Sequence, residues 1–152
     1  MSSTTAIEAT DALDIPHPPE VVWRVVADVA AYPDWWPSAL RLQVLHAEPE
    51  VVGTEVEIHP VGGQSFRVRV LSVDPPAAMR LEYYGGFLTG HGLWRLEAAP
   101  GGTRVHYDLD ARADGWVVAM LARLMPLPRL HSELMQSVLR ELARVCDMVD
   151  EG

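Results

Sequence analysis

Apolar and charged residues alternate with a period of two in several short stretches of the chain. The clearest are Thr54–His59, Phe66–Val70, Met79–Tyr83, Leu93–Ala98 and Arg104–Ala111. In each stretch one face is apolar and the other carries charged side chains, which is typical of a β-strand that meets water on one side only. Turns rich in glycine and proline separate the stretches, so the pattern predicts neighbouring antiparallel strands.

The first part of the chain adds two strands and a helix. Ala6–Ile15 alternates in part, and Leu40–Leu45 alternates clearly. Between them, Pro18, Pro19 and Glu20 suit a helix N-terminus, and the valines that follow recur at helical spacing. We expect this helix to end at the prolines of the segment AYPDWWP, residues 31–37.

The last third of the chain changes to a helical period. Gly115–Met125 is a candidate for a short helix, and apolar residues from Pro128 to Val149 predict a long one. No internal repeat or low-complexity linker interrupts residues 1–152, so we expect a single domain.

These elements predict an α+β fold, because a sheet with one apolar face must bury that face. Only the C-terminal helix is long enough to cover it. We therefore expect a helix-grip fold: a curved seven-stranded antiparallel sheet wrapped around the long C-terminal helix, with one or two short helices after the first strand. One helix does not fill such a trough along its whole length, so we expect a hollow beside it.

Four segments carry a resemblance to a known family: Ile15–Pro37, Arg69–Pro76, Gly90–Ala111 and the terminal helix. With them the sequence resembles the START-like or helix-grip superfamily (SRPBCC), and within it the polyketide cyclase/dehydrase and lipid-transport group. Members of the superfamily include aromatic polyketide cyclases, plant hormone receptors, lipid carriers, quinone-binding proteins and co-chaperones. The resemblance implies an internal cavity between the sheet and the long helix, but fold alone does not fix the activity.

The adjacent tryptophans of AYPDWWP, Trp35 and Trp36, have two interpretations. By the resemblance, this segment borders the mouth of the cavity, so one indole fills the core and the other faces the opening. Alternatively, both rings pin the segment to the sheet edge, which we favour for Trp35 and leave open for Trp36.

Charge and cysteine content narrow the classes of partner. The formal net charge is −9, which disfavours both nucleic acid and an anionic membrane surface as partners. The single cysteine, Cys146, suits a helix core, and a reducing compartment is the simplest expectation. We see no signal peptide and no apolar run long enough to span a bilayer, so we expect a cytoplasmic protein without integral membrane association. A homodimer is compatible with the sequence.

The sequence lacks a convincing catalytic set. No histidine or cysteine spacing suits a metal, and no glycine-rich motif suits a phosphate or dinucleotide, so we expect neither metal nor cofactor. The weak catalytic candidates are His131, Tyr83 and Asp11. Asp11 shares the parity of the inward residues of its strand, but we favour a bulge that turns it outward.

We expect the cavity to be apolar with a few polar groups. The candidate ligand-binding residues are Trp36, Tyr83, Phe87, Trp94, Tyr107, His131, Leu134 and Met135. Phe87 and Leu88, at the tip of a predicted hairpin, are candidates for a lid. Gly90 and Gly92 have inward parity, which leaves room either for a ligand or for a close backbone approach.

Three functions fit these expectations. The first is binding or transport of a small hydrophobic or amphipathic ligand, such as a lipid, a quinone or an aromatic polyketide-like molecule. The second is a polyketide cyclase or dehydratase acting in the same cavity. The third is a protein-interaction module, as in co-chaperone or ribosome-associated relatives.

Overall fold

The structure is a computed structural model that describes residues 4–61 and 63–150. Its seven strands form one antiparallel sheet in the order β1-β7-β6-β5-β4-β3-β2. The strands are β1 (Thr4–Ile15), β2 (Leu40–His46), β3 (Glu55–Pro60), β4 (Phe66–Asp74), β5 (Ala78–Tyr84), β6 (Leu88–Ala99) and β7 (Gly102–Asp114). The helices are α1 (Pro19–Ala27), the 3-10 turn η1 (Val29–Ala31), α2 (Tyr32–Trp35), α3 (Trp116–Leu124) and α4 (Leu127–Asp150).

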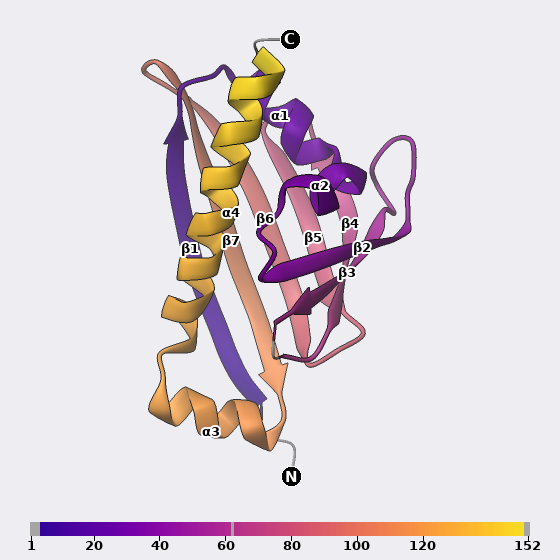
Figure 1. The fold of residues 1–152 in the computed structure, drawn as a ribbon, viewed down its shortest axis with the longest axis vertical. Coiled ribbons are helices and arrows are strands. Elements are labelled where there is room, and N and C mark those ends of the chain that lie inside the picture. The colour runs from indigo at the N-terminus through magenta and orange to yellow at the C-terminus, as the bar shows by residue number, and fades with distance from the viewer. Residues whose placement is uncertain (1–3, 62, 151–152) are drawn as a thin grey trace.

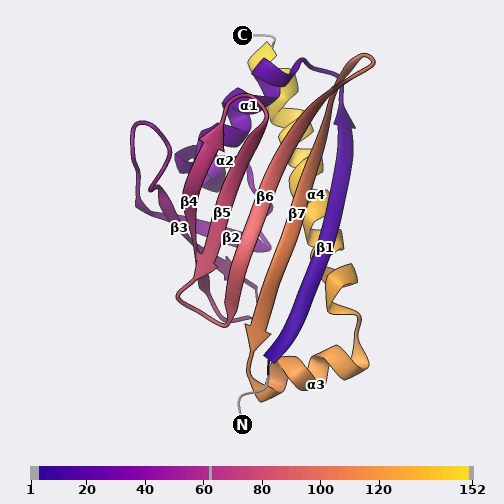
Figure 2. The ribbon, with the colours of Figure 1, turned by 180° about the vertical axis from the view of Figure 1, so that it is seen from behind.

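All the helices lie on one face of the sheet. In Figure 1 they stand in front of the strands, and in Figure 2, seen from behind, the strands lie in front of them. The long helix α4 runs along β1, α1 and α2 cover the other half of the sheet, and α3 crosses one end (Figure 1). The predicted helix-grip fold is thus confirmed, with a curved sheet around a long C-terminal helix.

The outer face of the sheet carries the charged residues that the alternation predicted there. Arg69 forms ion pairs with Glu55 at 2.9 Å and with Glu82 at 3.2 Å. On the neighbouring strands, Arg95 pairs with Asp108 at 2.6 Å. Such cross-strand pairs on a wet face add little stability each, but they hold the polar side of the sheet toward water.

One stripe of α4 forms the centre of the core. Its fully buried members share one face of the helix: Val138, Leu139, Leu142 and Cys146. They pack with the inward side chains of the strands and the buried valines of α1 in a single hydrophobic cluster. The predicted core position of Cys146 is confirmed.

The segment AYPDWWP is more ordered than its prolines indicated, because it forms η1 and the one-turn helix α2. The hydroxyl of Tyr32 donates a hydrogen bond to the carbonyl of Val26, which ties the segment to α1. Trp35 is buried and meets the Tyr32 ring edge to face, with 5.2 Å between centroids. Trp36 is half-buried and stacks on the Tyr32 ring, also with 5.2 Å between centroids. The two indoles therefore have different environments.

Asp11 differs from our expectation. The pairing of β1 with β7 is regular from Thr4 to Ile15, with no bulge, so Asp11 keeps its inward parity opposite Tyr107. Its side chain is buried, and the Ser132 hydroxyl of α4 donates a hydrogen bond to its carboxylate at 3.1 Å. This partner from another element explains how an aspartate is accommodated on an apolar face.

Gly90 and Gly92 make room for the protein itself. A Cβ on Gly90 would overlap the Asp110 carbonyl of β7 and lie 2.6 Å from the Cα of Ala111. A Cβ on Gly92 would overlap the hydroxyl of Tyr107 and lie 2.9 Å from its Cζ. Of the two alternatives from the sequence, close approach therefore accounts for both glycines.

We predict that Gly92→Ala destabilises the protein by about 1–3 kcal/mol, because the new methyl group overlaps the hydroxyl of the buried Tyr107, whose ring packs against Trp94. The measurement is the free energy of urea-induced unfolding. Gly63→Ala is the control, since its Cβ would lie 3.5 Å from that of Pro60, an ordinary contact. The double variant Gly92→Ala/Tyr107→Phe should lose less than the sum of the two single variants, and simple additivity would contradict the overlap.

Candidate ligand-binding cavity

A cavity of about 270 Å³ lies between the inner face of the sheet and the helices α3 and α4. All seven strands contribute to its wall, as do the residue after α2 and the two C-terminal helices. Of the 17 residues that line it, only Trp36, Tyr83 and His131 have a polar side-chain atom. The hollow exists because the buried stripe of α4 fills the trough only at the end near α1. At the other end α4 begins after a bend at Pro126, which joins it to α3.

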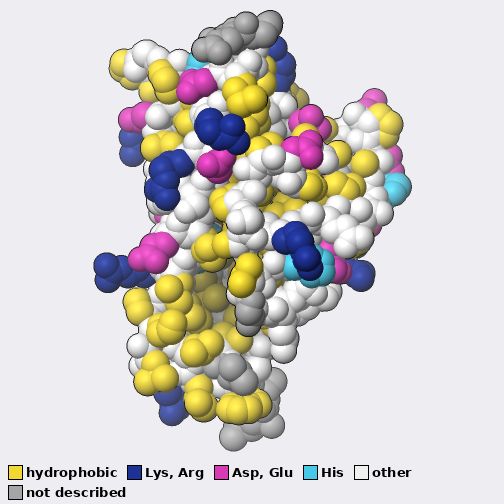
Figure 3. Space-filling view, in the orientation of Figure 1, with side chains coloured by type: hydrophobic (Ala, Val, Ile, Leu, Met, Phe, Trp, Pro, Cys, Tyr) yellow, Lys and Arg dark blue, Asp and Glu magenta, His cyan; other side chains and the backbone are white. Residues whose placement is uncertain are grey.

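The mouth of the cavity lies where α3 meets α4. Leu121 of α3 and Leu134 of α4 both line the cavity and are exposed, so they form its rim. Figure 3 shows hydrophobic side chains gathered on this lower part of the molecule, over α3 and the first turns of α4. An apolar molecule entering the cavity would pass these side chains.

The structure brings together most of the ligand-binding candidates from the sequence. Six of them line the cavity: Trp36, Tyr83, Phe87, His131, Leu134 and Met135. Tyr107 instead borders a much smaller void of about 20 Å³ behind it. Trp94 is fully buried beside Tyr107, with 4.9 Å between ring centroids, and belongs to the core and not to the cavity wall. Leu88, the second candidate for a lid, is buried in the wall.

The sequence interpretation missed the contribution of α3. Val118 and Leu121 of this helix and Leu127 at the start of α4 close one side of the cavity. The signal was present, because residues 116–122 are all apolar, but periodicity alone does not say which wall a short helix builds.

Tyr83 in the cavity wall is paired with Tyr107, which borders the smaller void. The hydroxyls of Tyr83 and Tyr107 hydrogen-bond to each other above Gly92. Burial raises the pKa of Tyr83 to about 12 and that of Tyr107 well above its usual value, and the neighbouring Tyr83 raises the pKa of Tyr107 further. Both remain protonated at neutral pH, so they can donate or accept a hydrogen bond but carry no charge.

His131 and Asp11 form a second polar group beside the tyrosines. The His131 ring stacks on that of Tyr107, with 6.4 Å between centroids, and its Nδ1 lies 4.0 Å from an Asp11 carboxylate oxygen. That Nδ1 is enclosed and has no hydrogen-bond partner among the described residues. Burial lowers the pKa of His131 below its usual 6.5, and the Asp11 carboxylate opposes this in part. The imidazole is therefore neutral at pH 7 and retains hydrogen-bonding capacity.

The lowered pKa of His131 predicts that acid destabilises the fold. The unfolded chain takes up a proton near pH 6.5, whereas the folded protein resists it to lower pH. This contribution to stability is complete above about pH 6.5 and is lost as the pH falls through the folded pKa. His131→Leu should therefore flatten the fall in unfolding free energy between about pH 7 and pH 5.

The matched control for this pH experiment is His91→Leu, because His91 is exposed on the outer face of the sheet. The unfolding free energy of both variants is measured by urea titration at several pH values. An unchanged pH slope in His131→Leu would contradict the buried, neutral imidazole.

Residues 6–147 match the family described as polyketide cyclase / dehydrase and lipid transport. The chain belongs to this family. The match covers nearly the whole sequence, whereas none of the curated proteins compared with the sequence matches it significantly.

Solved structures with the family's fold resemble the chain at low sequence identity. The di-domain ARO/CYC protein StfQ of the steffimycin biosynthetic pathway superposes with a TM-score of 0.75 at 15% identity, over 97% of this chain and 52% of StfQ. A protein from Thermus thermophilus superposes with a TM-score of 0.74 at 21% identity, over 93% of this chain and 97% of that protein. Norcoclaurine synthase from Thalictrum flavum gives 0.65 at 14% identity, over 96% of each chain. At these identities the likeness establishes the fold.

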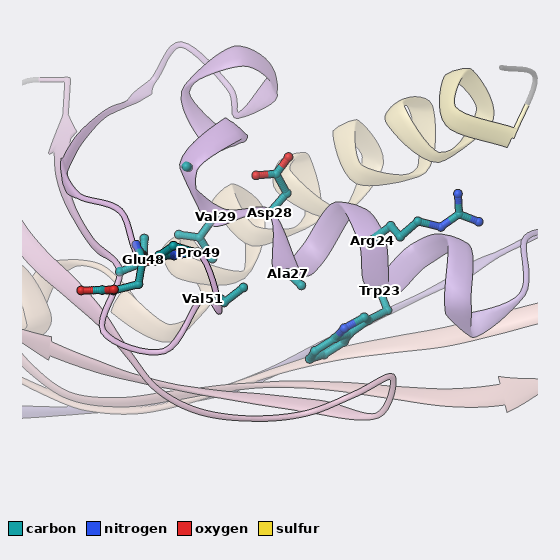
Figure 4. A pocket seen from close by; sticks show the side chains of 10 residues that line it. Trp23, Arg24, Ala27, Asp28, Val29, Glu48, Pro49 and Val51 are labelled. Carbon is teal, nitrogen blue, oxygen red and sulfur yellow. Dashed lines mark hydrogen bonds between the residues drawn. The ribbon is translucent and has the colours of Figure 1, made fainter.

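A larger, more open groove of about 360 Å³ lies outside the grip of the sheet, between α1 and the loop that joins β2 to β3. Its wall combines Trp23 and Val51 with charged residues. Figure 4 shows the charged ends of Arg24, Asp28 and Glu48 directed away from one another, so they do not converge on a ligand. We therefore place the candidate site of this family member in the smaller apolar cavity, where enclosure favours binding.

The described residues contain no group of three His, Cys, Asp or Glu side chains arranged to hold a metal ion. None of the helices in residues 4–61 and 63–150 combines the length and the hydropathy that crossing a bilayer requires.

Proposed function

We propose that the protein binds a small, mainly apolar molecule that carries one or two polar groups at one end. The observation that carries this proposal is the cavity, whose wall is apolar except for Trp36, Tyr83 and His131. A molecule with its apolar body along the strands and its polar end near the tyrosine pair would match that wall. The family's description includes both cyclases and lipid transport, and an amphipathic ligand suits either.

The expected affinity follows from the area that such a ligand buries. About 300 Å² of apolar surface removed from water is worth about 7 kcal/mol before the entropic cost of association. The polar contacts add orientation. The Nε1 of Trp36 and the Nδ1 of His131 are both enclosed without a hydrogen-bond partner among the described residues, so a ligand oxygen or hydroxyl would reach them only after the rings move.

Native mass spectrometry tests this proposal on protein purified gently from its own host. We expect a complex heavier than the 16.8 kDa chain that releases one apolar molecule on denaturation. A chain that is consistently empty, and that also fails to enhance the fluorescence of an apolar naphthalene probe, would argue against ligand binding.

Proton-transfer catalysis in the same cavity is the second candidate, and the Asp11–His131 geometry favours it. A neutral histidine beside a buried carboxylate can take a proton from a bound polyketide-like substrate, and the carboxylate stabilises the cation that forms. Nδ1 lies 4.0 Å from that carboxylate, and a small ring rotation would bring the two into hydrogen-bonding range. In that role His131→Ala and Asp11→Asn abolish turnover of an accepted substrate but leave its binding largely intact. Turnover that survives His131→Ala would exclude this role.

A further inference from the structure

The helix α3 is apolar on two faces. Val118 and Leu121 face the cavity, whereas Trp116, Met120 and Leu124 recur every four residues along another face. That second face is open to solvent, with Trp116 68% and Leu124 76% exposed. A nine-residue helix that is apolar on both sides and covered on only one leaves an apolar surface that water does not favour.

The charge around this face differs from that of the chain as a whole. Residues 115–132 contain no acidic side chain, although the chain has 21, and they include Arg123 and Arg129. Arg123 lies on α3 next to Leu124, and Arg129 lies in the first turns of α4; both are exposed, as are the flanking acidic residues Asp114 and Glu133. The net charge of −9 disfavours an anionic surface for the whole chain, but the one charged residue of α3 itself is the cation Arg123.

We propose that the α3 surface, defined by Trp116, Met120, Leu124, Arg123 and Arg129, docks on the face of an anionic lipid bilayer. Apolar side chains that include a tryptophan enter the interfacial region, and arginines beside them pair with anionic headgroups. An anionic bilayer matches an apolar face that contains a tryptophan and has arginines beside it, and the experiment below distinguishes it from a second copy of the chain.

The position of this surface adds a consequence for the cavity. Leu121 and Leu134, which form the rim, adjoin the α3 surface, and Figure 3 shows hydrophobic side chains continuing across this end of the molecule. Docking would therefore bring the cavity mouth to the bilayer, so an apolar molecule could pass between them without crossing water. This consequence rests on the proposed ligand binding, but docking itself does not.

Vesicle co-sedimentation of the full chain tests docking without any ligand. We expect the protein to bind vesicles of equal parts phosphatidylcholine and phosphatidylglycerol about 30-fold more tightly than phosphatidylcholine alone, since each arginine near an anionic surface is worth roughly fivefold. Arg123→Gln/Arg129→Gln should remove this preference. Leu124→Glu should weaken binding to both kinds of vesicle by at least about tenfold.

Each variant has a matched control elsewhere on the surface. Met148→Glu makes the same kind of change at an exposed site near the far end of α4, and Arg41→Gln/Arg80→Gln removes two exposed arginines of the sheet. Both controls should bind vesicles like the unmodified protein. Circular dichroism verifies that all variants are folded. The proposal would be overturned if the protein bound neither kind of vesicle, or if the variants and the controls lost vesicle binding equally. It would also be overturned by a dimer in sedimentation equilibrium that Leu124→Glu dissociates.

Discussion

Trp94→Ala is expected to destabilise the protein by about 3–5 kcal/mol, the cost of emptying a large aromatic site in a packed core. Trp94 is fully buried on β6, between Met79 of β5 and Tyr107 of β7 in the register of the sheet. Its ring meets that of Tyr107 edge to face. The loss of these contacts leaves a void that the neighbouring strands cannot close, because their hydrogen-bonded spacing is fixed.

Two further tryptophan variants sharpen this test, again by urea-induced unfolding. Trp116→Ala removes the same side chain from an exposed site and should change stability by no more than about 0.5 kcal/mol. Trp94→Phe keeps an aromatic ring and removes an indole Nε1 that has no hydrogen-bond partner among the described residues, so it should cost much less than Trp94→Ala. Equal losses for Trp94→Ala and Trp116→Ala would show that the core is not centred on Trp94.

Leu134→Trp is expected to weaken the binding of an apolar probe by about 50-fold. The larger indole takes the space of about three methylene-sized groups of the probe, and the burial of each such group is worth about 0.8 kcal/mol. Leu134 lines the cavity from α4 at its rim, so a larger side chain there enters the mouth without disturbing the buried stripe of the helix. Fluorescence titration with a naphthalene probe measures the effect.

Leu45→Trp is the matched control for this cavity experiment. Leu45 is 40% exposed and Leu134 38%, but Leu45 lies on β2 outside the cavity wall. The control should bind the probe like the unmodified protein, and both variants should unfold at similar urea concentrations. Equal weakening by the two substitutions would mean that the probe binds elsewhere on the surface.

The strands were predictable from the sequence because apolar and charged residues alternate along them, and this alternation reflects one buried and one solvent-facing side of the sheet. Segments such as Phe66–Val70 and Arg104–Ala111 place every second residue in the core, and the structure extends them only at their ends. The family resemblance supplied what periodicity does not give, namely the grip of the sheet around the terminal helix. The short helices of residues 29–35 were harder to predict from the sequence, because the prolines there suit an irregular segment equally well.

The candidate site was less predictable than the fold, because it depends on contacts between elements that lie far apart in the sequence. Asp11 can be buried because Ser132, 121 residues later, donates a hydrogen bond to it. No local sequence pattern around Asp11 predicts that partner. Likewise, Gly92 looked like space for a ligand, but Tyr107 of the next strand occupies it. Trp94 has the same inward parity as the cavity residues, and only its position along the strand places it in the filled end.

Binding of an apolar ligand in the hollow under α3 and α4 is the central claim, and methyl NMR with a naphthalene probe tests it most directly. The enclosed cavity and the open groove outside the sheet are lined by separate sets of methyl groups. We predict shifts at Leu109, Leu127 and Leu134, which line the enclosed cavity. Shifts confined to Ala27, Val29 and Val51, in the groove outside the sheet, or no saturable shift at all, would contradict the account.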